Sequence, residues 1–245
     1  MARKLRSAAG GFVYHVLNRA VGRGTLFDDD GEYFAFEKAL AEVVARTGMR
    51  LLAYCLMPNH WHLLLWPRKD GQLSTFMRLL TVTHVRRWHA HRGTGGTGPL
   101  YQGRFKSFPV QDDRHFLIVA RYVERNPLRA NLVRRAGAWT WSSLWRRANA
   151  PGDSPWLAAQ AAWPVPAPRG TTWEAFVQAA ETAAELEALR RSVARGAPFG
   201  RRAWVARTAK RLDLESSLRP RHRPKKTRNR PAAPGSRPKP PGRST

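Results

Sequence analysis

Two histidines one residue apart, His60 and His62, stand in the run LMPNHWHLLLW at residues 56–66. The part after Pro58 is short, aromatic and aliphatic, which predicts a strand. Residues i and i+2 of a strand point to the same face, so both imidazoles project from one side of a sheet. Two neutral imidazoles so placed can bind one divalent metal ion and leave positions open for a substrate oxygen. Such a pair can also be an ordinary polar feature of a sheet face.

A second candidate group stands in the run RYVERNP at residues 121–127. Tyr122 and Asn126 are four residues apart and therefore share a face of a helix. A carboxamide oxygen is a reasonable third ligand for Mg²⁺ or Mn²⁺. A phenol near that metal suits phosphodiester cleavage, in which the tyrosine oxygen attacks phosphorus and the metal supports a leaving 3′-oxygen. A tyrosine packed in a core and an asparagine that ends a helix before proline are the simpler interpretations.

The surrounding chain predicts the elements that position these groups. Strands are expected at 11–17, 49–56, 60–66 and 105–110, the last at an edge because it contains Pro109. Helices are expected from Asp28–Asp30 to Gly48, over 74–91, and from Asp112 or Asp113 to Asn126. This order predicts an α+β fold, a ferredoxin-like antiparallel sheet with helices on one face and the other face or an edge free for a ligand.

The texture changes after Trp145, and four segments are predicted. Residues 1–148 form the sheet domain, and residues 149–170 form an Ala/Pro-rich connector. Residues 171–217 form a helical extension that begins with one helix running to Arg195. Residues 218–245 have almost nothing to bury and are expected to be a disordered basic tail.

Charge indicates the class of partner. The chain has 43 Lys and Arg against 17 Asp and Glu, a net charge of +26. Half of that excess, +13, lies in residues 201–245 and favours nucleic acid, bound through counterion release. No run approaches the roughly 18 apolar residues of a membrane span, so no membrane partner and a cytoplasmic, nucleoid-associated location are expected. A single cysteine, Cys55, excludes an intrachain disulfide and a thiolate zinc cluster.

Over residues 12–144 the chain resembles the HUH tyrosine transposases, and most closely the REP-associated tyrosine transposases. The matching stretches are YHV at 14–16 with Asn18-Arg19, MPNHWHL at 57–63, YQGRF at 101–105, Tyr122 with Asn126-Pro127 and RANLV at 129–133, and WTWSS at 139–143.

The resemblance implies a metal-dependent endonuclease and strand transferase of DNA transposition that acts on single-stranded DNA, often at hairpins formed by palindromic repeats. His60 and His62 match the metal-binding histidine pair, Tyr122 the nucleophile that forms a 5′-phosphotyrosine intermediate, and Asn126 the polar metal ligand. The cofactor is then Mg²⁺ or Mn²⁺, and the protein a monomer or a homodimer. Glu124-Arg125 departs from the family's usual His-Leu type of pair.

Basic residues near the predicted site and in the tail are candidate phosphate contacts. The expected DNA-binding residues are Arg104, Lys106, Arg121, Arg125, Arg219, Arg221, Arg223, Lys225 and Lys226. Trp66 shares the face of the histidines and is a candidate base-stacking platform, whereas Trp61 should face the core. For the tail, sequence-blind electrostatic tethering is preferred over specific groove contacts.

Two other functions compete with this one. A nucleic-acid-binding protein that has lost catalysis accounts equally well for the basic tail. A metal-dependent hydrolase using activated water accounts for the histidines and needs no tyrosine. Replacing Tyr122 by phenylalanine separates both from the covalent mechanism.

Overall fold

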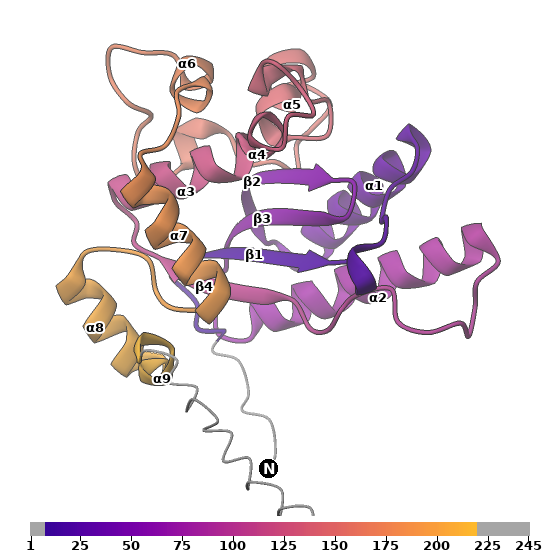
Figure 1. Cartoon of the computed structure of the whole chain (residues 1–245), viewed down its shortest axis with the longest axis horizontal. Helices are drawn as coiled ribbons and strands as arrows, with labels where there is room; N and C mark the ends of the chain where they lie inside the picture. The colour runs from indigo at the N-terminus through magenta and orange to yellow at the C-terminus, as the bar shows by residue number, and fades with distance from the viewer. Residues whose placement is uncertain (1–7, 220–245) are drawn as a thin grey trace, which may run out of the picture.

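The computed structural model describes residues 8–219, which contain one antiparallel sheet. Its strands are β1 (Val13–Arg19), β2 (Arg50–Met57), β3 (His60–Trp66) and β4 (Lys106–Val110). They lie in the order β2-β3-β1-β4, and each neighbouring pair is antiparallel (Figure 1). Helix α1 (Asp30–Thr47) joins β1 to β2, and α2 (Gln72–Arg92) joins β3 to β4. The α+β class and the ferredoxin-like arrangement are confirmed, and β4 lies at an edge as predicted.

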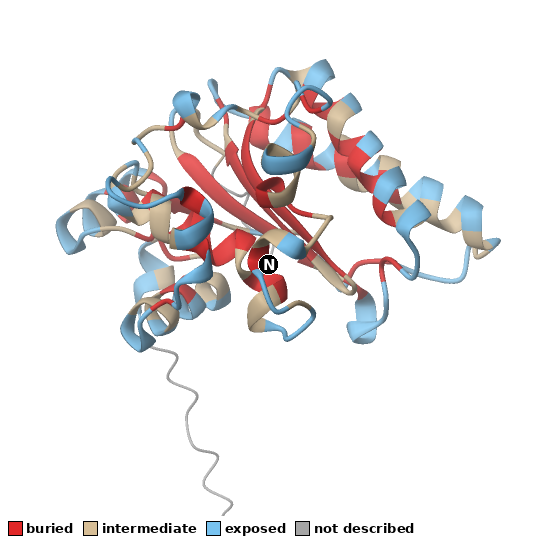
Figure 2. Ribbon diagram, turned by 90° about the horizontal axis from the view of Figure 1, so that it is seen from above, coloured by how far each residue is buried: buried red, intermediate tan, exposed pale blue. Residues whose placement is uncertain are grey.

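Helices α1 and α2 cover one face of the sheet. Helix α1 begins where the Asp29 side chain accepts a hydrogen bond from the backbone N–H of Glu32, and it ends at Gly48 with φ of 63°. Its apolar stripe packs on the residues of β3 that point away from the histidines, among them Trp61 and Leu63. The buried residues of this face form the larger of two hydrophobic clusters. Figure 2 shows the strands of the sheet mostly in the colour of buried residues.

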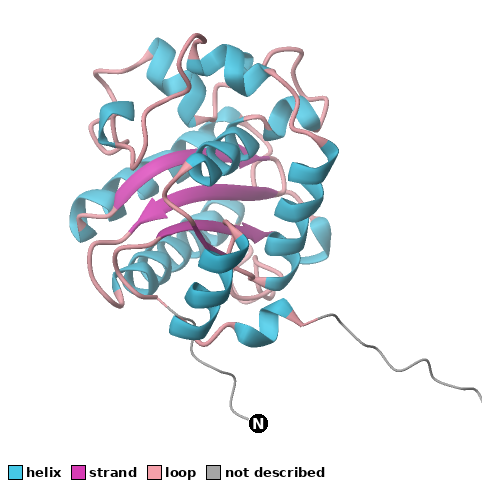
Figure 3. Ribbon diagram, turned by 90° about the vertical axis from the view of Figure 1, so that its left-hand side faces the viewer, coloured by secondary structure: helices cyan, strands magenta, loops and turns pink. Residues whose placement is uncertain are grey.

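The opposite face is also covered, which corrects the expectation of helices on one face alone. Helix α3 (Arg114–Glu124) packs on β2 and β3, and α6 (Trp173–Gln178) and α7 (Ala183–Arg195) lie on the same side (Figure 3). The physical reason is the composition of the strands, since Leu52 and Leu64 point to this second face and must be buried.

Helix α3 is followed by short elements. Asp113 caps α3 by accepting from the backbone N–H of His115, and α4 (Asn126–Arg129) comes directly after it. The remaining elements are η1 (Val21–Arg23), η2 (Ala136–Ala138), α5 (Ser143–Asn149), η3 (Gln160–Ala162), α8 (Arg202–Arg211) and α9 (Glu215–Leu218).

Two structural features of the connector and the extension were not predicted. Residues 171–195 form two helices instead of one, because the Thr182 side chain and Glu185 make a capping box that starts α7 afresh. The connector is packed: Trp163 is buried and contacts the rings of Phe116 and Trp173 edge to face. The segment boundaries at 148, 170 and 217 stay predictions.

No helix in residues 8–219 combines the length and the apolar character needed to cross a membrane. Leu218, expected to begin the disordered tail, is the last residue of α9. The rest of that prediction, from residue 220 on, lies outside the described residues.

Candidate active site

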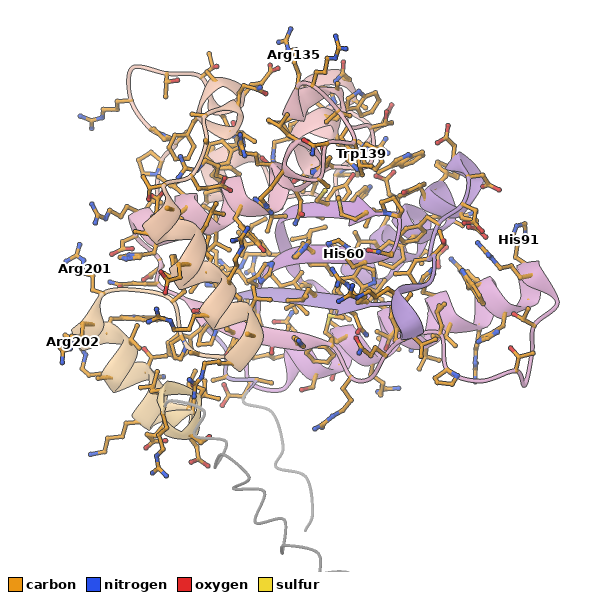
Figure 4. All side chains as sticks on the ribbon, viewed as in Figure 1. His60, His91, Arg135, Trp139, Arg201 and Arg202 are labelled. Atoms are coloured by element: carbon orange, nitrogen blue, oxygen red, sulfur yellow. The ribbon has the colours of Figure 1, made fainter. Side chains whose placement is uncertain are left out.

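The histidine pair lies on the second face of the sheet. The ring centroids of His60 and His62 are 5.0 Å apart, and Figure 4 labels His60 over the middle of the sheet. His62 is buried and His60 is half-buried. Between them Trp61 points to the other face and is fully buried, as the alternation of a strand predicts. Both imidazoles therefore project from one side, under α3.

Each histidine has a neighbour that fixes which ring nitrogen is available. His60 Nδ1 lies 2.6 Å from Asn59 Oδ1, and an amide oxygen only accepts, so His60 donates there and keeps a lone pair at Nε2. His62 Nδ1 lies 2.9 Å from His15 Nε2. When His62 donates in this second bond, its Nε2 is free in the same way. His15 is fully buried, and its Nδ1 has no partner among residues 8–219.

All three imidazoles are held neutral. Burial lowers the pKa of His15 to about 3 and, together with the charges of Arg19 and Arg129, lowers the pKa of His60 to about 4. The pKa of His62 is lowered well below its ordinary value, mainly by burial. A neutral imidazole is the form that binds a metal ion, and near pH 7 no proton has to be displaced from these rings first.

Tyr122 lies beside the histidines. Its ring centroid is 5.9 Å from that of His62 and 6.1 Å from that of His15, both edge to face. The Arg129 guanidinium covers the tyrosine ring at 4.1 Å and donates to the Tyr122 carbonyl oxygen. In the part of the chain that the structure describes, no group hydrogen-bonds to the phenol hydroxyl. The ring is therefore held while its hydroxyl oxygen is unengaged.

Asn126 stays in helical register with Tyr122. Helix α3 ends at Glu124, but Arg125 keeps right-handed helical geometry, and Arg129 N–H bonds to its carbonyl oxygen. Pro127 was predicted to disfavour helical geometry at Asn126. Asn126 is nevertheless helical, because proline is tolerated in the first turn of α4. Asn126 is buried, and its Nδ2 has no hydrogen-bond partner in residues 8–219. A buried amide nitrogen without a hydrogen-bond partner is unusual in a folded protein and calls for an explanation.

These donors suit a divalent cation. The described residues contain no group of three or more His, Cys, Asp and Glu side chains that would hold a metal by themselves. The Nε2 atoms of His60 and His62 and the side-chain amide oxygen of Asn126 would together offer a mixed nitrogen and oxygen set of the kind that Mg²⁺ or Mn²⁺ accepts.

The structure separates the predicted DNA-binding residues into two groups. Arg104 and Lys106 are exposed and have no ion pair within residues 8–219. Arg121 is buried and paired with Glu185 at 2.8 Å, and Arg125 is paired with Glu181 at 3.3 Å. The expectation that these last two are open to DNA is corrected, because carboxylates of the extension already neutralise them.

The other predicted contacts lie at or beyond the end of the described chain. Arg219 is exposed, whereas Arg221, Arg223, Lys225 and Lys226 lie outside the described residues.

Trp66, the candidate base platform, carries the Arg50 guanidinium 3.6 Å from its ring centroid, so one face of the Trp66 ring is already occupied.

Glu124, the departure from the family pattern, has a structural place. Its carboxylate is fully buried and accepts hydrogen bonds from Ser143, from Arg147 at 2.7 Å and from Trp173 Nε1 at 2.6 Å. It therefore joins α3 to α5 and α6, two residues after Tyr122.

Three residues of the site, Asn59, Arg19 and Arg129, had no predicted role beyond the matching stretches that contain them, and His15 was considered near the metal but left out of the predicted ligands. Asn59 stands next to His60 in a turn, a signal that was visible. His15 is 47 positions from His62, and only the pairing of β1 with β3 brings the two together. Arg19 lies directly opposite His60 in that pairing.

Known proteins resemble this chain in sequence and in fold. Residues 9–126 match the family model described as transposase IS200 like. No curated protein matches the chain. A solved structure of a REP-associated tyrosine transposase bound to a REP hairpin is similar, with 18% identity, a TM-score of 0.51, and coverage of 62% of this chain and 87% of that one. At this identity the likeness shows the fold. A Deinococcus radiodurans R1 protein described as a transposase matches with 20% identity and a TM-score of 0.35, over 51% of this chain and 95% of that one.

Proposed function

Because residues 9–126 place the chain in the IS200-like transposase family, we propose that it cleaves and rejoins single-stranded DNA at hairpins through a covalent bond to Tyr122. The observation that carries this proposal is the position of the Tyr122 ring, 5.9 Å from His62 on a different element. The hairpin substrate is supported by the similar transposase, which was solved bound to a REP hairpin.

The chemistry of the chain's own residues begins at the phenol. The Tyr122 oxygen attacks the scissile phosphorus, forms a 5′-phosphotyrosine ester and loses its proton to solvent. The bond from phosphorus to the 3′-oxygen breaks, and that oxygen takes up a proton to leave a free 3′-hydroxyl. The ester conserves the energy of the phosphodiester, so a 3′-hydroxyl can later reverse the step and join strands. Stacking of Arg129 on the Tyr122 ring restricts its orientation for this attack.

His60, His62 and Asn126 are the residues that would hold Mg²⁺ or Mn²⁺. A bound ion supplies Lewis-acid polarisation of the phosphate and stabilises charge on the leaving oxygen. Asn59 engages Nδ1 of His60, and His15 engages Nδ1 of His62; with His62 as the donor in that second bond, Nε2 of each ring would be the ligand atom.

The tyrosine and the histidines come from one chain, which supports attack within a single subunit. This arrangement is compatible with a monomer, and a homodimer needs no exchange of Tyr122 to complete the site. An enzyme acting on chromosomal hairpins would work at the nucleoid.

The test is a labelled DNA hairpin incubated with the full chain and Mg²⁺ or Mn²⁺, followed by denaturing electrophoresis. A covalent protein–DNA adduct is expected, and Tyr122→Phe abolishes it. Tyr33→Phe is the matched control, because Tyr33 stacks on Trp141 at the opposite face of the sheet and should leave the adduct intact. An adduct that survives Tyr122→Phe refutes the assignment.

The main alternative is a binding protein of the same fold without catalysis, which accounts equally well for the net charge of +26. Tight hairpin binding with no adduct under any metal condition would establish it. Strand cleavage that persists in Tyr122→Phe would instead indicate hydrolysis by water.

A further inference from the structure

The stretch YQGRF at residues 101–105 takes no part in the chemistry above, yet its first residue is firmly anchored. The Tyr101 hydroxyl accepts a hydrogen bond from Trp61 Nε1 at 2.9 Å and bonds to His84 Nδ1 at 2.6 Å. Tyr101 is buried, and its two partners lie on β3 and α2. The loop that follows is therefore held against the end of the sheet by buried hydrogen bonds.

After Tyr101 the chain crosses the end of β1 and turns its side chains outward. Gln102 N–H bonds to the Arg19 carbonyl oxygen at 3.0 Å, and Asn18 Nδ2 donates to the Gly103 carbonyl oxygen at 3.3 Å. Gln102, Gly103 and Arg104 are all exposed, and a Cβ added at Gly103 would meet no atom within 4 Å. The surface above this loop is open.

A first hollow, of about 470 Å³, lies on the active-site side of the loop. Its lining includes Leu17 and Arg19, which pair with His62 and His60 in the sheet. Residues directly opposite one another in an antiparallel pair share a face, so this hollow begins beside the histidines. Arg104 and Lys106 complete its charged lining.

A second hollow, of about 740 Å³, lies between the loop and α2. Asn18, Gly103 and Arg104 line both hollows, so the two adjoin across the loop. Arg78 and Arg86 add exposed cations from α2. The apolar residues of the same lining are Met77, Val82, Val85, Leu100 and Phe105.

The charge of the residues that line the two hollows indicates which kind of ligand the hollows bind. No Asp or Glu lines either hollow, and the five cations have no ion pair within residues 8–219. The hollow between α1 and α2 contains Asp29 and Glu32, and the one between α3 and α7 contains Glu185. Continuous positive charge beside apolar surface suits the phosphates and bases of an unpaired strand.

We propose that these two hollows form one track for the single strand that flanks the cleavage site. The track runs from Arg19 beside His60, over Gly103 and Arg104, to Arg78 and Arg86 on α2. Phosphates lie on the arginines, and bases lie on the apolar lining between them. This inference rests on the proposed function, since it takes the histidine site as the point where the strand enters.

The experiment measures binding of the full chain in EDTA by fluorescence anisotropy. The probes are a synthetic DNA stem-loop with flush ends and the same stem-loop with an oligothymidine extension on its 5′ or its 3′ side. Wild type is expected to bind one of the two extended probes more tightly than the flush probe. Arg78→Ala/Arg86→Ala should remove that advantage and lower the slope of log affinity against log salt by about 1.4, from about 0.7 per single-strand phosphate contact.

The matched control is Arg46→Ala/Arg190→Ala, which removes two exposed and unpaired arginines that line neither hollow. Equal weakening of extended and flush probes by the track variant and the control would overturn the proposal, because only net charge would then matter. Loss of flush-probe binding in the track variant alone would also overturn it, since the surface would then bind the duplex. As a second measurement, 4-thiothymidine in the extension should photo-crosslink to residues 78–86 or 101–105, and crosslinks confined to other segments contradict the track.

Failure here is distinct from failure of the proposed function. A Tyr122-dependent adduct with unchanged strand binding in Arg78→Ala/Arg86→Ala removes the track and keeps the enzyme. Strand binding that depends on Arg78 and Arg86, without any adduct, would contradict the proposed enzyme and keep the track. The crosslinks would then still show whether the bound strand passes the histidines.

Discussion

Histidines are buried on both faces of the sheet, but the polar groups around them are satisfied on one face and partly unsatisfied on the other. On the face covered by α1 and α2, His84 is bonded to the Tyr101 hydroxyl, which also satisfies Trp61. On the face covered by α3, His15 Nδ1 and Asn126 Nδ2 have no partner in the described chain, and the Tyr122 hydroxyl has none either. Satisfied polar groups stabilise a unique core, whereas unsatisfied ones are available to something that the protein binds. Adjacent residues of β3 thus point to two different faces, where Trp61 stabilises the core and His60 and His62 serve the proposed chemistry.

The sharpest way to break this comparison is to replace two neighbours. Trp61→Ala should lower the free energy of unfolding by about 3–5 kcal/mol, because it opens a cavity in the α1/α2 face. His60→Ala, on the half-buried side, should change it by less than about 1 kcal/mol and yet abolish adduct formation. Urea denaturation and the hairpin assay measure the two effects. Equal destabilisation by the two substitutions would contradict the division of labour.

A smaller effect is expected from the residues behind the histidines. His15→Phe and Asn59→Ala should each weaken Mn²⁺ binding about 10–100-fold, because His62 and His60 lose the partners that orient them. Calorimetric titration of DNA-free protein measures the affinity without reference to turnover. His84→Phe is the control from the other face and should leave Mn²⁺ affinity unchanged. Unaltered affinity in His15→Phe would show that the bond to His62 is only a packing contact.

The smallest effect concerns pH. Burial lowers the pKa of His84 in the folded protein to about 3, from 6.5 when it is exposed. Below 6.5 the unfolded chain therefore binds a proton that the folded chain does not. The contribution of His84 is fully present above pH 6.5 and is lost as the pH falls toward 3, at roughly 1 kcal/mol per pH unit. Urea midpoints from neutral pH down to about 5 should fall less steeply in His84→Gln than in wild type. Identical slopes would mean that His84 is protonated in the folded state.

Local signals in the sequence were sufficient for most of the fold. Asp29, Asp113 and Gly48 mark helix ends that follow from short-range hydrogen bonding and backbone geometry, and the turn at Pro58-Asn59 fixes the β2–β3 hairpin. The covering of the second face was missed, because an amphipathic helix states that it has a buried side but not which surface buries it. The break between α6 and α7 was missed because the sequence alone does not show whether Thr182, like Thr172, caps a new helix or lies inside the first one.

For the site, spacing and the family resemblance predicted His60, His62, Tyr122 and Asn126, and the structure brings Tyr122 to His62. Asn59, the partner of His60, is its neighbour in sequence, whereas the partner of His62 depends on long-range pairing. His15 meets His62 only through the register of β1 and β3. The pairing of Arg121 and Arg125 depends on Glu185 and Glu181, which come from an extension whose docking no local pattern encodes.

The buried carboxylate of Glu124 has a consequence for any attempt to express the sheet domain by itself. Trp173, one of its three donors, lies beyond the predicted end of the sheet domain at residue 148. A fragment cut at that boundary would keep the ion pair of Glu124 with Arg147 but would leave the buried carboxylate short of one donor, two residues after Tyr122. The sheet domain is therefore not independent of the extension, and cutting the chain at residue 148 is expected to destabilise it through the loss of this hydrogen bond.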